Sequence, residues 1–116
     1  MSRRLRKTVP KERLSHSEWE IMRICWRLGH CTVREVLKED HHRPKRDYRT
    51  ILTFMTRMER KGWLQVEKDG NTNCYSPAVN RKKALQSEID RFFEDVVGSD
   101  PEGLELVRRA FAAKKR

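Results

Sequence analysis

The feature that most constrains the fold is a change of hydrophobic period at Gly62. Before this glycine, apolar residues recur at helical spacing in three successive segments. After it, residues 64–68 and 73–76 alternate as short strands do, and residues 69–72 (Asp-Gly-Asn-Thr) have the composition of a tight turn. A two-stranded hairpin is not stable alone in water, so it must pack on the helices. The side chains expected to make that contact are Leu64, Val66 and Tyr75.

Capping residues mark where the first two helices begin. Ser15 or Ser17 precedes a glutamate by three residues, and so does Thr32, so each helix can start with a capping box. The first helix is apolar on nearly two faces, as a helix buried between others must be. We therefore expect Trp19 and Trp26 to be core residues rather than platforms for stacking bases.

The third predicted helix lies within residues 45–63, with Asp47 as a possible cap, and has two opposed faces. Its apolar stripe, which would face the core, consists of Ile51, Phe54, Met55 and Met58. Its other face combines guanidinium groups with short hydroxyls and consists of Arg46, Arg49, Thr50, Thr53, Arg57 and Arg60. Such a face is typical of a helix in the DNA major groove, where arginine can bind guanine and threonine can contact a base edge. A solvated surface helix can have the same composition, so the surroundings must decide.

The charge distribution favours a polyanionic partner for the first two-thirds of the chain. The formal net charge is +10, which suggests nucleic acid, an anionic membrane surface or an acidic protein as the partner. Residues 1–13 hold six Lys and Arg against one acid, and residues 41–61 hold seven against two. Residues 84–113 instead hold seven acids against three arginines. A uniformly cationic protein would not be segregated in this way.

Basic and amide side chains outside the third helix are candidates for binding phosphate oxygens. Residues 1–13 contain too few apolar groups to pack, and we expect a flexible basic arm that either aids solubility or reaches a minor groove. The candidates in the arm are Arg3, Arg4 and Arg6. Those near the third helix and in the hairpin are Lys45, Lys61, Lys68, Asn71 and Asn73.

Residues 79–116 predict two further helices, separated by Gly98 and a start signal at residues 99–102. Their apolar residues are too numerous for a lone appendage, and their acids would be repelled by DNA. Both features favour a homodimer, which would place two recognition helices on successive major grooves of an inverted repeat. The predicted dimerisation residues are Leu85, Ile89, Phe92, Phe93, Val96, Leu104, Val107 and Phe111.

Three helices followed by a hairpin is the element order of a winged helix. We therefore predict a mainly α protein with a small β-hairpin. Its parts are a flexible arm over residues 1–13, a winged helix-turn-helix DNA-binding domain over 14–78 and a helical dimerisation region over 79–116.

Other classes of protein find little support in the sequence. Cys25, Cys31 and Cys74 are odd in number and irregularly spaced, which favours reduced thiols in a cytoplasmic protein. No apolar run is long enough to span a bilayer, so we expect no membrane insertion. No catalytic constellation or glycine-rich phosphate loop stands out, and we expect a non-enzyme without cofactors.

Several segments resemble the penicillinase repressor family of winged-helix regulators, the group of BlaI, MecI and CopY. The matching segments are residues 14–22 with Trp26, 49–53, 57–62, 69–77, and Phe92-Phe93 before Gly98-Ser99. The resemblance implies a homodimeric repressor that occupies a double-stranded DNA operator and is released by an inducing event. In antibiotic-sensing members, a regulatory protease cuts an Asn-Phe bond in the dimerisation region. The nearest counterpart here is Ala110-Phe111, which lacks the asparagine.

Besides a protein–protein adaptor, two alternatives remain open at the level of sequence. One is an RNA-binding or ribosome-associated winged-helix module, which would expose stacking aromatics and tolerate single strands. The other is a metal-responsive repressor that would use histidines and cysteines, although the copper-sensing members carry a cysteine-rich tail that this chain lacks. The candidate metal ligands are His30, Cys31, His41 and His42, with Cys25 or Cys74.

Overall fold

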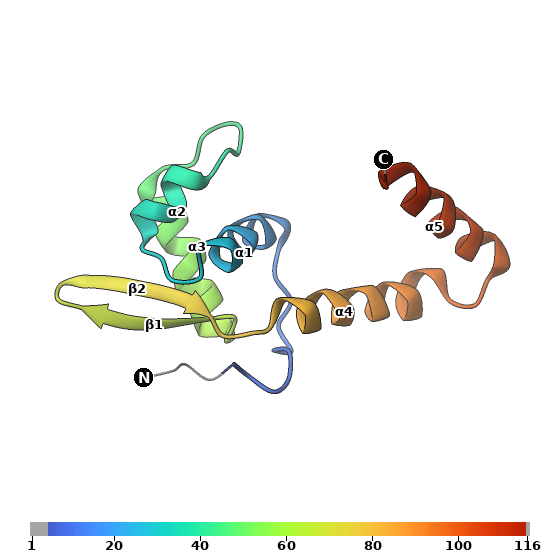
Figure 1. The fold of residues 1–116 in the computed structure, drawn as a ribbon, viewed down its shortest axis with the longest axis horizontal. Helices are drawn as coiled ribbons and strands as arrows, with labels where there is room; N and C mark the ends of the chain where they lie inside the picture. Colours follow the sequence, from blue (N-terminus) through green and yellow to red (C-terminus); the bar gives the residue numbers. More distant parts are fainter. Residues whose placement is uncertain (1–4, 116) are drawn as a thin grey trace. The chain divides into compact units, whose positions relative to one another are not determined.

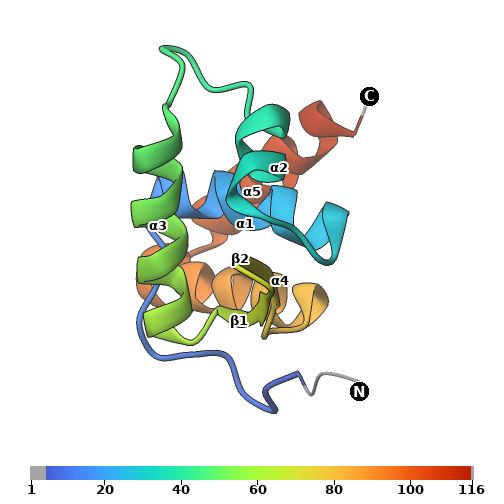
Figure 2. The same ribbon diagram turned by 90° about the vertical axis from the view of Figure 1, so that its left-hand side faces the viewer.

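A three-helix cluster followed by a β-hairpin forms the first part of the protein. The computed structural model describes residues 5–115, and the chain divides into two compact units, Met1–Lys83 and Ala84–Arg116. The first unit contains α1 (His16–Leu28), α2 (Val33–Glu39), α3 (Tyr48–Lys61), β1 (Leu64–Asp69) and β2 (Thr72–Pro77), as Figures 1 and 2 show. This order confirms the predicted winged helix-turn-helix.

The helix boundaries follow from the capping residues. Ser15 and Thr32 each form a complete capping box, in which the glutamate three residues later accepts a hydrogen bond from the backbone N–H of the cap residue. The Asp47 carboxylate accepts a hydrogen bond from the Thr50 backbone N–H at 2.8 Å and so starts α3. Gly62 ends α3 in the left-handed region at φ 93°, which a residue with a Cβ adopts at a cost.

The core of this unit takes residues from all three helices and the base of the hairpin. Ile21, Val36 and Ile51 are completely buried. Trp19 lies between two other indoles, with ring centroids 5.9 Å from Trp26 and 5.6 Å from Trp63. The Trp26 indole N–H donates to the Val79 carbonyl at 2.9 Å. Trp63 is buried, while Trp19 and Trp26 are half-buried, so both pack against the domain, as expected, but at the margin of the core.

The hairpin packs on the helices only at its base. Leu64 and Tyr75 are buried, as predicted, but Val66 is 41% exposed, which corrects the expectation that it would pack. Beyond Gln65, strand β1 extends away from helical cover, so Val66 stays exposed although it pairs with the buried Tyr75. A backbone bridge between Cys31 and Tyr75 also ties β2 to the start of α2, which no sequence pattern indicated.

The second unit contains little that is buried. Helix α4 (Arg81–Phe92) begins in the first unit, and the second unit continues with a π-helical segment η1 (Phe93–Val97) and helix α5 (Pro101–Lys114). The sequence predicted one continuous helix up to Gly98, but the α-helix ends at Phe92 and a π-helical turn replaces its last part. Within residues 5–115, no helix is both long and apolar enough to cross a membrane.

Candidate nucleic-acid interface

The solvent-facing side of α3 carries most of the residues that were predicted for the recognition face. Ile51, Met55 and Met58 attach the helix to the core and are fully buried. This leaves the opposite side exposed, with Arg49, Thr50, Thr53, Arg57 and Arg60. Five of the six residues predicted for the recognition face therefore lie on one accessible surface, which we call the recognition face.

Two shallow hollows follow the recognition face along α3. The first, of about 300 Å³, is lined by Asp47, Arg49, Thr50 and Thr53. The second, of about 270 Å³, is lined by Leu52, Thr53, Thr56, Arg57 and Arg60. Thr53 lines both hollows, so the two are adjacent along α3. Most of the side chains that line them are polar. Thr56 is a member that the sequence analysis missed, although its helical position, three residues from Thr53, could have indicated it.

Local contacts restrict what two of these side chains can do. The Thr53 hydroxyl donates to the Arg49 carbonyl at 2.9 Å, so toward a ligand it can only accept a hydrogen bond or offer its methyl group. The Arg57 guanidinium carbon lies 5.8 Å from the centre of the Phe54 ring, within the range of a cation–π contact. That contact leaves the guanidinium edge available as a hydrogen-bond donor.

Arg46 has a different place from the one predicted. It precedes α3, is 7% exposed, and donates to the Asp40 carboxylate at 3.0 Å and to the Glu20 carboxylate. Its guanidinium carbon also lies 5.8 Å from the centre of the Phe54 ring. The prediction that Arg46 belongs to the recognition face is wrong because the helix begins two residues later and internal carboxylates hold this side chain.

The Lys61 side chain also makes its contacts within the domain. Its ammonium lies 2.7 Å from the carboxylate of Glu18, which is completely buried, and 3.0 Å from the Arg13 carbonyl. Burial alone would raise the pKa of Glu18, but hydrogen bonds from Lys61 and the Ser15 backbone, together with the Lys61 charge, bring it below its ordinary value. The predicted phosphate contact by Lys61 is therefore replaced by a structural ion pair.

The candidates outside α3 are distributed over a loop, the hairpin and the N-terminal segment. Lys45 is exposed in the loop before α3, and Lys68, Asn71 and Asn73 are exposed on the hairpin. In the N-terminal segment, the Arg6 backbone N–H donates to the Ala78 carbonyl at 2.7 Å, and its guanidinium lies against Gly62. Arg3 and Arg4 lie outside the described residues.

From residue 6 onward, the described part of the expected flexible arm contacts the domain. Pro10 is buried, and the Trp63 indole N–H donates to the Glu12 carbonyl at 2.9 Å. Together with the bonds at Arg6 and Arg13, these contacts hold residues 6–13 along the first unit. The expectation of a flexible arm over residues 1–13 is thus corrected for residues 6–13.

The candidate metal ligands do not come together. Within residues 5–115, no group of three or more His, Cys, Asp or Glu side chains could hold a metal ion. Cys25 and Cys31 are buried, with their sulfur atoms 3.9 Å apart. The hydrogen bond with Cys31 and burial both raise the pKa of the Cys25 thiol, so it stays protonated at neutral pH.

The family comparison shows which class of regulator this chain resembles over most of its length. The family model for the penicillinase repressor matches residues 14–113, which covers both units. The chain belongs to the penicillinase repressor family. This is a family of DNA-binding transcriptional repressors with a winged-helix fold, so the resemblance expected from the sequence is confirmed.

Relatives of this family member share both sequence and fold with it. An uncharacterized 16.5 kDa protein of Latilactobacillus sakei is 37% identical over 87 residues, covering 73% of this chain and 58% of that protein. The penicillinase repressor of Bacillus licheniformis is 27% identical over 97 residues, covering 80% and 74%. The solution structure of Bacillus licheniformis BlaI in complex with the blaP half-operator superposes with a TM-score of 0.52 at 28% identity, covering 62% of this chain and 88% of that one.

The second unit of this family member exposes most of the predicted dimerisation residues. Of residues 84–115, all of which are described, only Ala84 is buried. Ile89 and Phe92 are about half exposed at 49% and 46%, and Phe111 is 63% exposed. Leu106, at 56%, was not predicted because its position falls outside the stripe formed by Leu104, Val107 and Phe111. Large exposed apolar side chains in such number mark an interaction surface.

Proposed function

We propose that this family member is a transcriptional repressor that binds a double-stranded DNA operator with α3 in the major groove. The observation that carries the proposal is the recognition face, which is exposed and polar on a helix whose other side is fixed in the core. A major groove admits an α-helix, and arginine and threonine are residues that read base edges there. The complex of the relative BlaI with a half-operator supports the same use of this fold.

We assign base contacts to the middle of the recognition face. Arg57 is long enough to form two hydrogen bonds to guanine, and Thr50 can contact a base edge. Thr53 would accept a hydrogen bond or contact a thymine methyl group, because its proton is already used. The residues proposed to bind phosphates are Arg49, Arg60, Lys45, Lys68, Asn71 and Asn73.

We further propose that the active form is a homodimer formed through the second unit. Its apolar side chains find little cover within the unit itself, and a second copy offers an identical apolar face of the same size. A two-fold axis would place two α3 helices about one helical turn apart on DNA, so the operator would be an inverted repeat. The protein would act in the cytoplasm, where a bacterial chromosome lies.

Release from the operator would follow any inducing event that weakens the dimer. A regulatory protease that cut Ala110-Phe111 would separate Phe111 from the rest of the proposed dimer face. That bond lies within α5, so cleavage would require local unfolding of the helix. Zinc or another metal is not part of this proposal.

The experiment is footprinting of the full chain on DNA upstream of its own gene, together with sedimentation equilibrium of the free protein. We expect a protected inverted repeat with half-sites about one helical turn apart, and a dimer in solution. The Thr50→Ala, Arg57→Ala double variant should lose the footprint and keep the dimer. If wild-type protein protects no duplex at moderate salt but binds RNA, the proposed function is wrong.

A further inference from the structure

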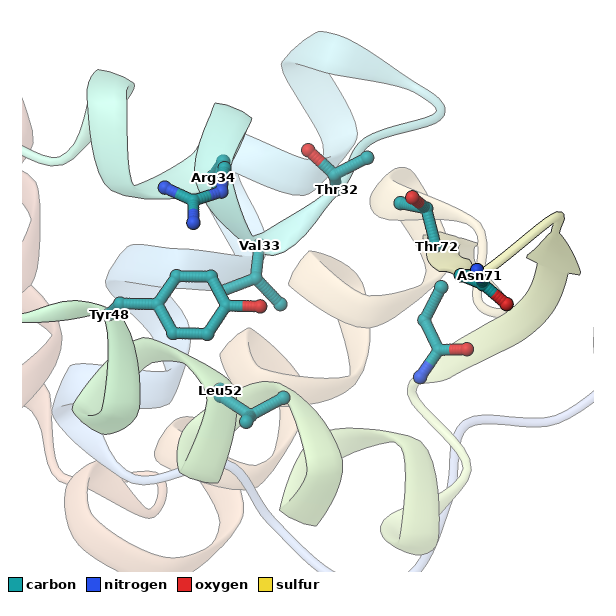
Figure 3. Close-up of a pocket in the computed structure, with 8 residues that line it drawn as sticks. Thr32, Val33, Arg34, Tyr48, Leu52, Asn71 and Thr72 are labelled. Atoms are coloured by element: carbon teal, nitrogen blue, oxygen red, sulfur yellow. The ribbon is translucent and has the colours of Figure 1, made fainter.

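A larger hollow lies beside the recognition face, between α2, α3 and the hairpin. It has a volume of about 420 Å³ and is shown in Figure 3. Arg34 and Tyr48 lie on one side of it, and Asn71 and Thr72 lie on the other. Its full lining consists of Thr32, Val33, Arg34, Tyr48, Leu52, Asn71, Thr72 and Asn73. Among these residues, only Asn71 and Asn73 were predicted from the sequence to contact DNA.

The lining combines an apolar part with a polar rim. Val33 and Leu52 contribute aliphatic surface, while Arg34, the Tyr48 hydroxyl and the hairpin amides contribute hydrogen-bond donors. None of the eight lining residues is acidic, and Arg34 supplies the one formal charge. This combination suits a ligand group with one negative charge attached to a less polar body.

The Arg34 side chain is held in place by an aromatic ring. Its guanidinium carbon lies 5.2 Å from the centre of the Tyr48 ring, which is a cation–π distance. Stacking on a ring restricts the guanidinium plane but leaves its N–H groups free to point outward, an arrangement suited to an anion with several oxygens.

The hollow is continuous with the recognition face through Leu52. This residue lines both the large hollow and the smaller hollow that contains Arg57 and Arg60. A duplex that placed base edges against Thr53 and Arg57 would therefore extend its sugar-phosphate backbone toward Leu52 and Tyr48. The neighbouring hollow is the space into which that backbone would pass.

We propose that one strand of the DNA backbone occupies this hollow, with a phosphate bound by Arg34 and Tyr48. The deoxyribose would lie against Val33 and Leu52, and Asn71 and Asn73 would hold the strand from the hairpin side. Arg34 and Tyr48 thereby take the phosphate-binding role that the sequence assigned to Lys61. This inference rests on the proposed function and specifies how the hairpin and α3 hold the duplex together.

The test is the salt dependence of binding to a short mixed-sequence duplex, which needs no knowledge of the operator. Each phosphate neutralised by the protein adds about 0.9 to the slope of log affinity against log salt. The proposed dimer carries two copies of Arg34, so we expect Arg34→Ala to reduce this slope by about two and to weaken binding by more than about tenfold at low salt. Arg34→Lys should retain the slope, because it keeps the charge.

Arg23→Ala is the matched control, since it removes an exposed arginine from α1 that does not line the hollow. It should leave slope and affinity at the wild-type values. The inference is overturned if wild-type protein binds the duplex and Arg34→Ala binds it equally well with the same slope. That result differs from failure of the proposed function, in which the wild-type protein itself binds no duplex.

Two further measurements identify the occupant. On the footprinted operator, ethylation of single phosphates should interfere with wild-type binding at one position in each half-site where it no longer affects Arg34→Ala. An unchanged interference pattern would contradict the assignment. Inorganic phosphate at millimolar concentration should not perturb the Tyr48 ring in NMR spectra of the free protein. Saturable phosphate binding that Arg34→Ala abolishes would instead assign the hollow to a free anion.

Discussion

The guanidinium of Arg46 lies 3.0 Å from the carboxylate of Asp40, and both side chains are almost completely buried, at 6% and 5% exposure. This ion pair, together with Glu20, fixes the loop that leads into α3. Arg46 therefore differs in role from Arg49, which lies three residues later and is exposed on the recognition face. One arginine holds the helix in place, and the other is available to DNA.

Arg46→Ala should therefore act on stability, and Arg49→Ala on DNA binding. Removing Arg46 leaves Asp40 buried without its partner, which costs about 3 kcal/mol of unfolding free energy. Arg49→Ala should change the unfolding free energy by less than about 0.5 kcal/mol. Urea denaturation of both variants checks this. Equal and small effects on stability would show that the Arg46 pair is not maintained in solution.

Lys61→Met should lower stability in a pH-dependent way. The folded-state pKa of Glu18 is below its ordinary value of 4.5, so this carboxylate stabilises the fold fully above that value, and the contribution is lost as pH falls from there through the lower, folded-state pKa. Without Lys61, a buried charge stays unpaired, at a cost of about 3 kcal/mol near neutral pH. We expect the difference from wild type to shrink at acid pH, where Glu18 becomes protonated.

Lys68→Met on the exposed hairpin is the control for that experiment. It should cost less than about 0.5 kcal/mol and show no added pH dependence. Thermal unfolding across a pH series measures both variants. A Lys61→Met deficit that is the same at every pH would contradict the role assigned to the Glu18 pair.

The native thiols should be protected from alkylation. Cys25 and Cys31 are 0% and 1% exposed, and the raised pKa of Cys25 keeps it in the unreactive thiol form. We expect a thiol reagent to modify the native protein orders of magnitude more slowly than the unfolded protein, in which all three cysteines react. Rapid modification of one cysteine in the native protein would show that a sulfur is accessible.

Much of the first unit could be predicted because its signals are local. The capping boxes at Ser15 and Thr32 and the glycine after α3 each depend on residues within one turn. The opposed faces of α3 likewise follow from helical spacing alone. These features give the element order and hence the winged helix.

The misplaced residues depend on contacts between distant parts of the chain. By helical spacing alone, Arg46 would lie on the same side as the recognition face. Its burial follows from its ion pairs with Asp40 and with Glu20, which is 26 positions earlier in the chain. The large hollow joins Arg34, Tyr48 and Asn71, which belong to three elements and share no sequence pattern. The π-helical turn at Phe93 was missed because its apolar residues also fit a continuous α-helix.

Phe92→Asp should convert the proposed dimer to a monomer, because it places a charge on a side chain that a second copy would cover. Ser99→Asp adds the same charge at an exposed polar position and should leave the dimer intact. Sedimentation equilibrium distinguishes the two variants. A stable Phe92→Asp dimer would place the dimer contact elsewhere.

The central claim, that the exposed face of α3 reads base sequence, is tested most directly with Arg57→Ala. The measurement is the ratio of its affinities for the footprinted operator and for a mixed-sequence duplex of equal length, compared with the wild-type ratio. The account predicts that operator affinity falls by about 1–3 kcal/mol while mixed-sequence affinity falls much less, so that the ratio drops. An unchanged ratio, with both affinities reduced alike or not at all, would contradict it.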